Sequence, residues 1–363
     1  MKRFLFLLML LLTSGYAVKA QIFNKNHILG DWVIRSYTTE KSGKTVRYPP
    51  RIEGLSFFEN HTYRIKDGFF KRSGNLKIYL GSSSQFKLTG QNLSLFNLSD
   101  KKWYNFQVIN LEGSSMQLVY NGIKFTYRRI EPYRQQPLFE TIVLTSSGCF
   151  GECPAFSISI DISGRVIFRG VYNTSKIGLY TGTISRKVYK ELELNFSKLR
   201  IDTMGKLPHH IDAMAMSTTF IKDGKVFKTI YNSDHDQSRE LRWAYIPLEN
   251  LYQQIKLKEE KVPNHLKNLD LRFHAGDKVI DMKPSDEFLL FTYLLKGKPV
   301  NHRFKTKFSF RSENEYSKKE EVLYTDGRYY KFMVNNKPLI LDIGFNFYDV
   351  NCTGLKWISD RYF

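Results

Sequence analysis

Residues 149–166 read CFGECPAFSISIDISGRV, and this stretch decides the fold class. Within it, residues 156–161 alternate apolar and polar side chains, which is typical of a strand with one face in a core. Ser163-Gly164 then marks a hairpin turn, because glycine adopts a positive φ without steric cost. Pro154 disfavours helix at the residue before it, so we place the two cysteines in a turn between strands.

The same alternation recurs along the chain, in short runs that are rich in aromatic residues, which make up 15% of the sequence. Four further dipeptides separate such runs and are expected to form hairpin turns: Asp67-Gly68, Asn121-Gly122, Asp223-Gly224 and Asp326-Gly327. Sequential hairpins predict a mainly β protein with antiparallel sheets and α+β parts, and they argue against a doubly wound parallel fold.

Helical periodicity occurs in three segments only, all in the second half of the chain. Residues 185–199, 236–255 and 285–295 place apolar side chains on one face at helical spacing. Pro247 could kink or divide the second of these helices.

Two polar segments that contain proline divide the chain. Residues 131–137 carry a proline near each end and read as a linker, and the charged segment 256–264 reads as a second joint. We therefore expect three domains after a signal peptide at residues 1–20. They are a β-barrel domain at 26–131, an α+β domain at 138–257 and a β-rich C-terminal domain at 264–363.

The N-terminal segment has the pattern of a secretory signal peptide. Lys2 and Arg3 precede an apolar run at residues 4–12, and Val18-Lys19-Ala20 supplies a cleavage site. The apolar run is about half of the roughly 18 residues that cross a bilayer, so we expect cleavage and no transmembrane segment afterwards. This predicts an exported protein of the periplasm, the cell envelope or the medium.

The chain is strongly basic. Its 363 residues include 55 Lys and Arg against 35 Asp and Glu, a formal net charge of +20, and the surplus is heaviest in residues 26–131. The positive electrostatic field of such a surface favours an anionic partner, here an anionic envelope component. Alternatively, the charge reflects a solvated basic surface without a partner. The expected export argues against nucleic acid.

Two short motifs bracket the front domain. Residues 29–32 read LGDW, and residues 125–130 read FTYRRI about one hundred positions later. This arrangement resembles the small lipocalin-like domains of bacterial exported proteins. The resemblance implies a barrel in which Arg129 packs over the indole of Trp32. It also implies a small apolar ligand inside the barrel, unless side chains such as Phe57 and Leu95 fill the interior.

The middle domain carries the most specific motif of the chain. Cys-Phe-Gly-x-Cys-Pro followed by a hairpin resembles a family of domains of unknown function from bacterial envelope proteins. Phe156 stands where that family commonly has tyrosine. The resemblance covers residues 138–257 and implies no activity.

The cysteine pair has three interpretations. In an oxidising compartment, a disulfide between Cys149 and Cys153 would clamp the loop and stabilise the fold by about 2 kcal/mol. A redox role would normally have two intervening residues rather than three, and zinc would need two further ligands. Cys352 is expected to be a buried free thiol.

Two polar loops of the middle domain are weak candidates for chemistry. His209, His210 and Asp212 lie in one loop, and Asp234, His235 and Asp236 lie in another. If the hairpin between them brought His210, Asp212 and His235 together, they could bind a metal or act as an acid and a base. Polar loops routinely contain such residues, and Asp236 could equally cap the following helix. No other cofactor or metal is expected.

Two hypotheses of function follow. The first is a non-enzymatic exported envelope protein that binds a small apolar ligand or an envelope partner surface. The alternative is a metal-dependent or acid–base hydrolase that uses the two histidine and aspartate loops.

Overall fold

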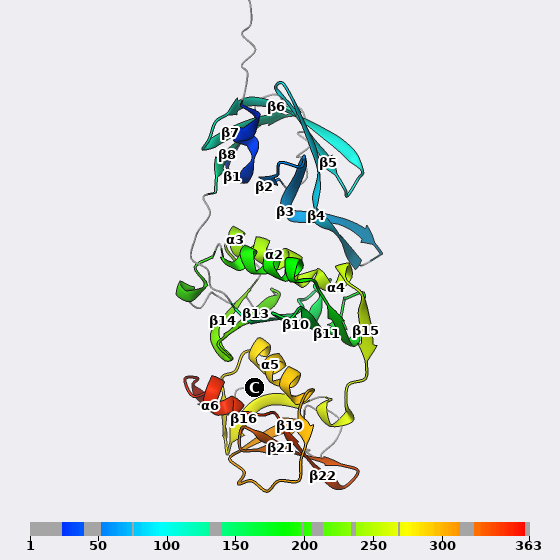
Figure 1. Cartoon of the computed structure of the whole chain (residues 1–363), viewed down its shortest axis with the longest axis vertical. Coiled ribbons are helices and arrows are strands. Elements are labelled where there is room, and N and C mark those ends of the chain that lie inside the picture. Colours follow the sequence, from blue (N-terminus) through cyan, green and yellow to red (C-terminus); the bar gives the residue numbers. More distant parts are fainter. Residues whose placement is uncertain are drawn as a thin grey trace, which may run out of the picture. The chain divides into compact units, whose positions relative to one another are not determined.

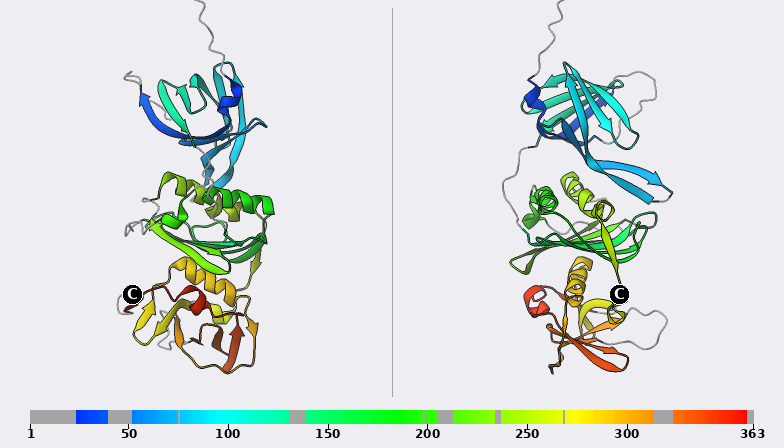
Figure 2. Two further views of the ribbon diagram at one scale, coloured as in Figure 1. Left: turned by 60° about the vertical axis from the view of Figure 1, so that its left-hand side comes forward. Right: turned by 45° about the vertical axis from the view of Figure 1, so that its right-hand side comes forward.

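A computed structural model describes most of the chain. The described residues are 24–39, 52–74, 76–130, 139–197, 199–204, 213–233, 237–267, 269–312 and 323–359. They separate into two compact units, a front unit of Met1–Phe69 and Ser82–Glu131 and a rear unit of Phe70–Gly81 and Pro132–Phe363. The described elements are mainly antiparallel strands, as predicted (Figures 1 and 2).

The front unit is built on a closed barrel of eight strands in sequential order. The strands are β1 (Gly30–Thr39), β2 (Gly54–Phe57), β3 (Thr62–Ser73), β4 (Leu76–Thr89), β5 (Asn92–Asn97), β6 (Lys102–Leu111), β7 (Ser115–Tyr120) and β8 (Ile123–Arg129). Strand β1 closes the barrel because Trp32 pairs with Leu55 of β2 on one side and with Arg129 of β8 on the other.

Side chains pack the barrel interior. Phe57 and Leu95 are both 2% exposed, and the Phe57 ring lies 5.0 Å from the Phe86 ring in an edge-on contact. The buried Tyr127 hydroxyl donates a hydrogen bond to the carbonyl of Ile52 at 3.0 Å. These contacts provide the barrel with an aromatic core.

One of the expected turns lies inside a strand. Asp67-Gly68 is part of β3, where the Asp67 side chain is buried and Gly68 has a φ of 71°. The glycine therefore accommodates an irregularity in a continuous strand instead of reversing the chain. Asn121-Gly122 and Asp223-Gly224 do form hairpin turns, with positive φ at both residues of each pair.

The rear unit contains a seven-stranded sheet, here called the middle sheet, in the order β14-β13-β9-β10-β11-β12-β15. Its strands are β9 (Thr141–Ser147), β10 (Ala155–Asp161), β11 (Arg165–Tyr172), β12 (Gly178–Thr183), β13 (Ala215–Lys222), β14 (Lys225–Ser233) and β15 (Leu257–Glu260). Because β15 pairs with β12, the sheet extends to Glu260, three residues past the end of the α+β domain expected at 138–257.

Two helices cover one face of the middle sheet. These are α2 (Arg186–Ser197) and α3 (Arg239–Glu249), which share a core with the sheet through residues such as Phe196, Leu241 and Phe168. The helix expected at 236–255 is divided at Asn250, after which α4 (Leu251–Gln254) begins. Pro247 lies within α3, so the division is not at the proline.

The opposite face of the middle sheet packs on α5 (Pro284–Leu294), a helix close to the expected 285–295. Beyond α5 lies an eight-stranded sheet in the order β18-β22-β21-β20-β19-β16-β17-β23. Its strands are β16 (Leu269–Ala275), β17 (Lys278–Ile280), β18 (Lys298–Pro299), β19 (Phe308–Ser312), β20 (Leu323–Thr325), β21 (Tyr329–Val334), β22 (Lys337–Asp342) and β23 (Trp357–Ser359). Helix α5 therefore lies between two sheets, as both views of Figure 2 show.

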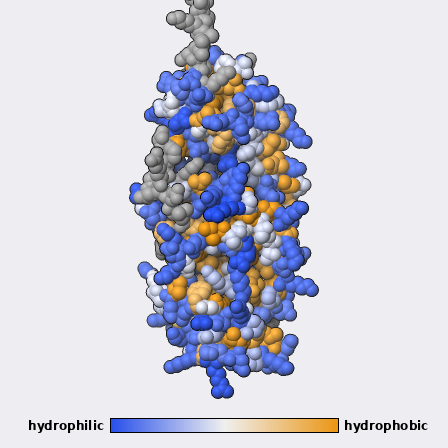
Figure 3. All heavy atoms as spheres, in the orientation of Figure 1, coloured by the Kyte–Doolittle hydropathy of each residue, from blue (hydrophilic) through white to orange (hydrophobic). Residues whose placement is uncertain are grey.

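A short helix in the tail was not predicted. Helix α6 (Phe347–Asn351) has five residues, too few for helical periodicity to register in the sequence. No helix in the described ranges is long and apolar enough to cross a membrane. Hydrophilic side chains predominate on the face in Figure 3, with apolar ones interspersed.

Candidate ligand-binding site

A row of five side chains crosses the middle sheet, here called the polar row. Strand pairing aligns Tyr231 with Ser217, Ser217 with Thr145, Thr145 with Ser157, and Ser157 with Arg169. Cross-strand neighbours on one face lie about 5 Å apart. The row therefore runs from a phenol, across three hydroxyls, to a guanidinium.

Residues next to the polar row in sequence show which face the row occupies. Leu144, Ile158, Phe168, Met216 and Ile230 are each adjacent to a row residue, and all are buried in the core under α2 and α3. Since successive side chains of a strand point to opposite faces, the polar row points toward α5.

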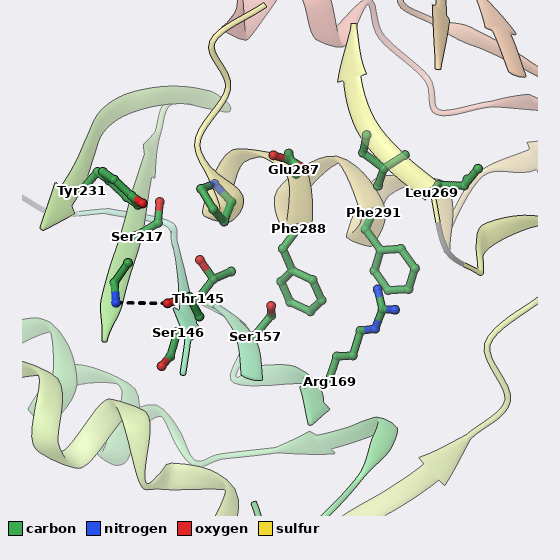
Figure 4. Close-up of a pocket in the computed structure, with 14 residues that line it drawn as sticks. Thr145, Ser146, Ser157, Arg169, Ser217, Tyr231, Leu269, Glu287, Phe288 and Phe291 are labelled. Carbon is green, nitrogen blue, oxygen red and sulfur yellow. Dashed lines mark hydrogen bonds between the residues drawn. The ribbon is translucent and has the colours of Figure 1, made fainter. Parts of the chain in front are cut away.

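Helix α5 and strand β16 complete a pocket of about 220 Å³ over the polar row. Phe288 and Phe291 extend from α5 toward the sheet, with Phe288 near Ser157 and Phe291 near Arg169 (Figure 4), and Glu287 of the same helix also lines the pocket. Leu269 and Leu271 of β16 add to the apolar wall, and Ser146, Ser147, Ala215 and Pro284 complete the lining.

Two hydroxyls of the polar row line the pocket and have no side-chain hydrogen-bond partner in the described part of the chain. Across the described ranges, neither Thr145 nor Ser157 forms a side-chain hydrogen bond, although Thr145 is only 6% exposed. Ser217 Oγ, by contrast, lies 2.6 Å from Ser285 Oγ. A hydroxyl both donates and accepts, so the centre of the row offers hydrogen-bonding capacity to a ligand.

The two ends of the polar row carry the stronger polar groups. The Arg169 guanidinium lies 5.5 Å from the centre of the Phe291 ring, a cation–π distance. Burial raises the pKa of Tyr231, and the charge of Lys283 offsets part of this rise, so the phenol stays protonated near neutral pH.

A buried network fixes the start of α5 on the sheet beside the polar row. Thr219 and Thr229 donate hydrogen bonds to Oδ1 of Asp286 at 2.6 and 2.8 Å, and the backbone N–H of Lys283 donates to Oδ2 at 3.1 Å. Burial raises the pKa of Asp286, and these hydrogen bonds offset part of the rise. Because Thr219 lies two residues from Ser217 on β13, the network holds the aromatic wall in a fixed position.

The cysteine loop begins next to the pocket-lining Ser147. Cys149 and Cys153 are joined by a disulfide with an S–S distance of 2.02 Å, in the turn between β9 and β10. Asn173 donates hydrogen bonds to the carbonyls of Gly151 and Cys153 at 3.1 and 3.3 Å. The third cysteine, Cys352, is free and buried, and burial raises the pKa of its thiol.

In the front unit, the structure brings Trp32 and Arg129 together. The guanidinium carbon of Arg129 lies 4.4 Å from the centre of the Trp32 ring. Arg129 also donates hydrogen bonds to the carbonyls of His27, Leu29 and Gly113, while the indole N–H of Trp32 donates to Ile28 at 2.7 Å. Together these bonds fix the 3₁₀ helix η1 (Lys25–Ile28) to the barrel.

The six histidine and aspartate candidates are outside the described residues. They are His209, His210, Asp212, Asp234, His235 and Asp236. In the part of the chain that the structure does describe, no three His, Cys, Asp or Glu side chains are grouped so as to hold a metal ion.

The polar row was not predicted from the sequence, although a signal was present. Residues 145, 157 and 217 are Thr, Ser and Ser in strands that are buried on both faces. Such strands are usually continuously apolar, so small polar residues on one face can indicate a site.

The residues of the pocket floor lie in a segment that matches a known sequence family. Residues 140–252 match the family described as Domain of unknown function (DUF6438). All five residues of the polar row lie inside the DUF6438 region, whereas the aromatic wall on α5 lies outside it. The site therefore joins the DUF6438 region to the C-terminal part of the chain.

One solved structure shares similarity with part of the chain. It is an uncharacterized protein from Bacteroides eggerthii DSM 20697, with 17% identity and a TM-score of 0.20, covering 28% of this chain and 98% of its own. No curated protein matches the chain.

Proposed function

We propose that this protein is an exported, non-enzymatic envelope protein that binds a small ligand in the pocket between the DUF6438 region and α5. The polar row carries this proposal, because it combines hydroxyls that lack a partner among the described residues with aromatic side chains in one pocket. Pockets for drug-sized ligands have about 300–1,000 Å³. A pocket of about 220 Å³ suits a smaller molecule.

The contacts of the lining hydroxyls favour binding over catalysis. Ser217 is hydrogen-bonded to another hydroxyl, that of Ser285, and a neutral hydroxyl does not activate a serine as a nucleophile. The hydrolase alternative would instead need the loops that contain His210, Asp212 and His235. A ligand held by hydroxyls and aromatic rings, without covalent chemistry, fits the observed groups.

The barrel of the front unit is the other place for a ligand. Its interior is occupied by packed side chains such as Phe57, Phe86 and Leu95. This packing supports a structural role for the barrel, which in this proposal belongs to the lipocalin-like class. We therefore place the ligand in the rear unit. The proposal leaves the exterior of the barrel available for contact with an envelope partner.

Export is supported by the N-terminal sequence pattern and by the cysteine pair. Disulfides persist mainly in oxidising compartments such as the periplasm. The disulfide between Cys149 and Cys153 is in keeping with such a location.

Saturation-transfer NMR tests the pocket. The probes are D-glucose, D-glucuronate, hexanoate, benzoate and L-alanine, each with the protein expressed without residues 1–20. We expect at least one probe to receive saturation from the wild type but not from Ser157→Trp, in which an indole fills the pocket. Ser36→Trp is the matched control, because Ser36 is an exposed strand serine of the front unit.

Circular dichroism and the melting temperature establish that both variants are folded. The proposal is overturned if no probe receives saturation, or if the signals persist in folded Ser157→Trp.

A further inference from the structure

We infer that the cysteine loop, residues 148–154, binds the protein to the surface of a lipid bilayer that contains anionic lipid, by inserting Phe150. This contact lies outside the ligand pocket and does not depend on it. Three observations support it: the exposure of Phe150, the rigid support of its loop, and the apolar side chains at the same end of the middle sheet.

Phe150 is the most exposed large apolar residue among those that the structure describes. It is 97% exposed, whereas no other large apolar residue in the described ranges exceeds 59%. Exposure of a phenyl ring to water is unfavourable, so the ring would gain free energy from an apolar partner. Its neighbour Gly151 has no side chain that could cover it.

The loop holds Phe150 in this exposed position. The disulfide between Cys149 and Cys153 closes the loop around it. Asn173 donates hydrogen bonds to two carbonyls of the loop at 3.1 and 3.3 Å, and the Tyr172 hydroxyl donates to the carbonyl just before the loop at 2.8 Å. The loop is therefore preorganised, and insertion of the ring costs little conformational entropy.

Three further apolar side chains are exposed at the same end of the middle sheet. Val171 and Tyr172 end β11, and Ile177 lies in the connection from β11 to β12. Because β9 to β12 are antiparallel neighbours, this connection and the cysteine loop lie at one end of the sheet. Tyr172 also pairs with Ala155, the first residue after the loop.

Phe150, Val171, Tyr172 and Ile177 are here called the apolar tip. A group of exposed apolar side chains marks a surface that contacts a partner. Peripheral proteins bury such side chains at the boundary between lipid headgroups and acyl chains, and aromatic side chains are favoured there.

The charge of the chain favours an anionic bilayer. The 55 Lys and Arg against 35 Asp and Glu attract a negative surface. Lys176 adds a positive charge next to Ile177. The acid of the loop, Glu152, lies 3.6 Å from Arg72 of the same unit in an ion pair, which offsets its repulsion of anionic headgroups.

Vesicle binding tests this contact. The probe is a vesicle of equimolar phosphatidylcholine and phosphatidylglycerol, with the protein expressed without residues 1–20. We expect the wild type to co-sediment with the vesicles and Phe150→Ser to bind at least about tenfold more weakly, because burial of one phenyl ring is lost. Phe227→Ser is the matched control and should bind like the wild type, since Phe227 is exposed on β14 at the opposite end of the sheet.

The depth of insertion provides a second readout. In vesicles with brominated acyl chains, the indole added by Phe150→Trp should be quenched, relative to the wild type with its four native tryptophans. The indole added by Phe227→Trp should not be quenched. This comparison detects contact with the acyl chains and does not depend on the affinity.

Three outcomes overturn the bilayer contact. They are no vesicle binding by the wild type, equal binding of Phe150→Ser, and no quenching in Phe150→Trp, with circular dichroism establishing that each variant is folded. Equal binding of Phe150→Ser would assign the attraction to the basic surface alone. Ser157→Trp, which fills the ligand pocket, should bind vesicles like the wild type, so failure of the pocket and failure of the apolar tip are distinguishable.

Discussion

The Arg129 guanidinium stacks on the Trp32 indole, with its central carbon 4.4 Å from the ring centre. The two residues are also cross-strand partners where β1 meets β8, so the stack lies on the seam that closes the barrel. Arg129 gains three carbonyl contacts there, which a simple cation over a ring would not provide. Its role is therefore to join the barrel seam to the segment before β1.

Gly30→Ala should destabilise the front unit. Gly30 has a φ of 110°, and a Cβ at this position would overlap the Nη1 atom of Arg129. We expect a loss of about 1–3 kcal/mol in the free energy of unfolding, from backbone strain and displacement of the arginine. The measurement is urea unfolding followed by tryptophan fluorescence.

Gly90→Ala is the control for this prediction. Gly90 also has a positive φ, of 56°, but a Cβ added to it would have no heavy atom within 4 Å. A loss for Gly90→Ala as large as that for Gly30→Ala would show that the arginine contact is unimportant.

Arg129→Lys should destabilise the barrel although it keeps the charge. A lysine cannot donate hydrogen bonds in a planar fork to the carbonyls of His27, Leu29 and Gly113. We expect a loss of about 1–3 kcal/mol, measured by the same unfolding experiment. Arg128→Lys, at an exposed neighbouring position, should change stability little, and equal effects of the two substitutions would contradict the prediction.

Replacing the disulfide should loosen the loop between β9 and β10. The double variant Cys149→Ser with Cys153→Ser is expected to lose about 2 kcal/mol, because the closed loop is short. Alkylation of the native protein should label neither residue before reduction and both afterwards, as read by intact mass. Labelling of Cys149 and Cys153 without reduction would contradict the disulfide.

Asp270 should make stability depend on pH at the acid end. Burial raises the pKa of Asp270, but His274, whose Nε2 lies 3.7 Å from Oδ2, and the hydrogen-bonded Arg272 guanidinium outweigh it and hold the pKa below its ordinary 3.8. The carboxylate therefore stabilises the fold above pH 3.8, and this stability is lost as the pH falls toward the lowered pKa.

The variant Asp270→Asn isolates this contribution. It should cost about 2 kcal/mol near neutral pH, and the difference from the wild type should shrink as the pH falls below 3.8. Urea midpoints of both proteins, measured from about pH 2 to about pH 7, give the difference at each pH. Asp277→Asn, at an exposed turn, is the control, and a pH-independent cost at Asp270 would refute the assignment.

Local features of this protein were predictable from sequence. Alternation in residues 156–161 predicts a strand because adjacent side chains of a strand face opposite ways. The helices α2 and α5 follow from apolar spacing within one segment. Errors occurred where the same local signal serves two structures, as at Asp67-Gly68, whose glycine lies inside β3.

The sequence by itself determined the class of fold, the turns at Asn121-Gly122 and Asp223-Gly224, and the cysteine loop, because each depends on neighbouring residues. Only the tertiary structure decided the polar row and its aromatic wall. Tyr231 and Arg169 become parts of one row through the register of five strands, and Phe288 reaches them from a helix beyond the DUF6438 region. Strand register is set by packing of the whole sheet, and no single segment of sequence contains that information.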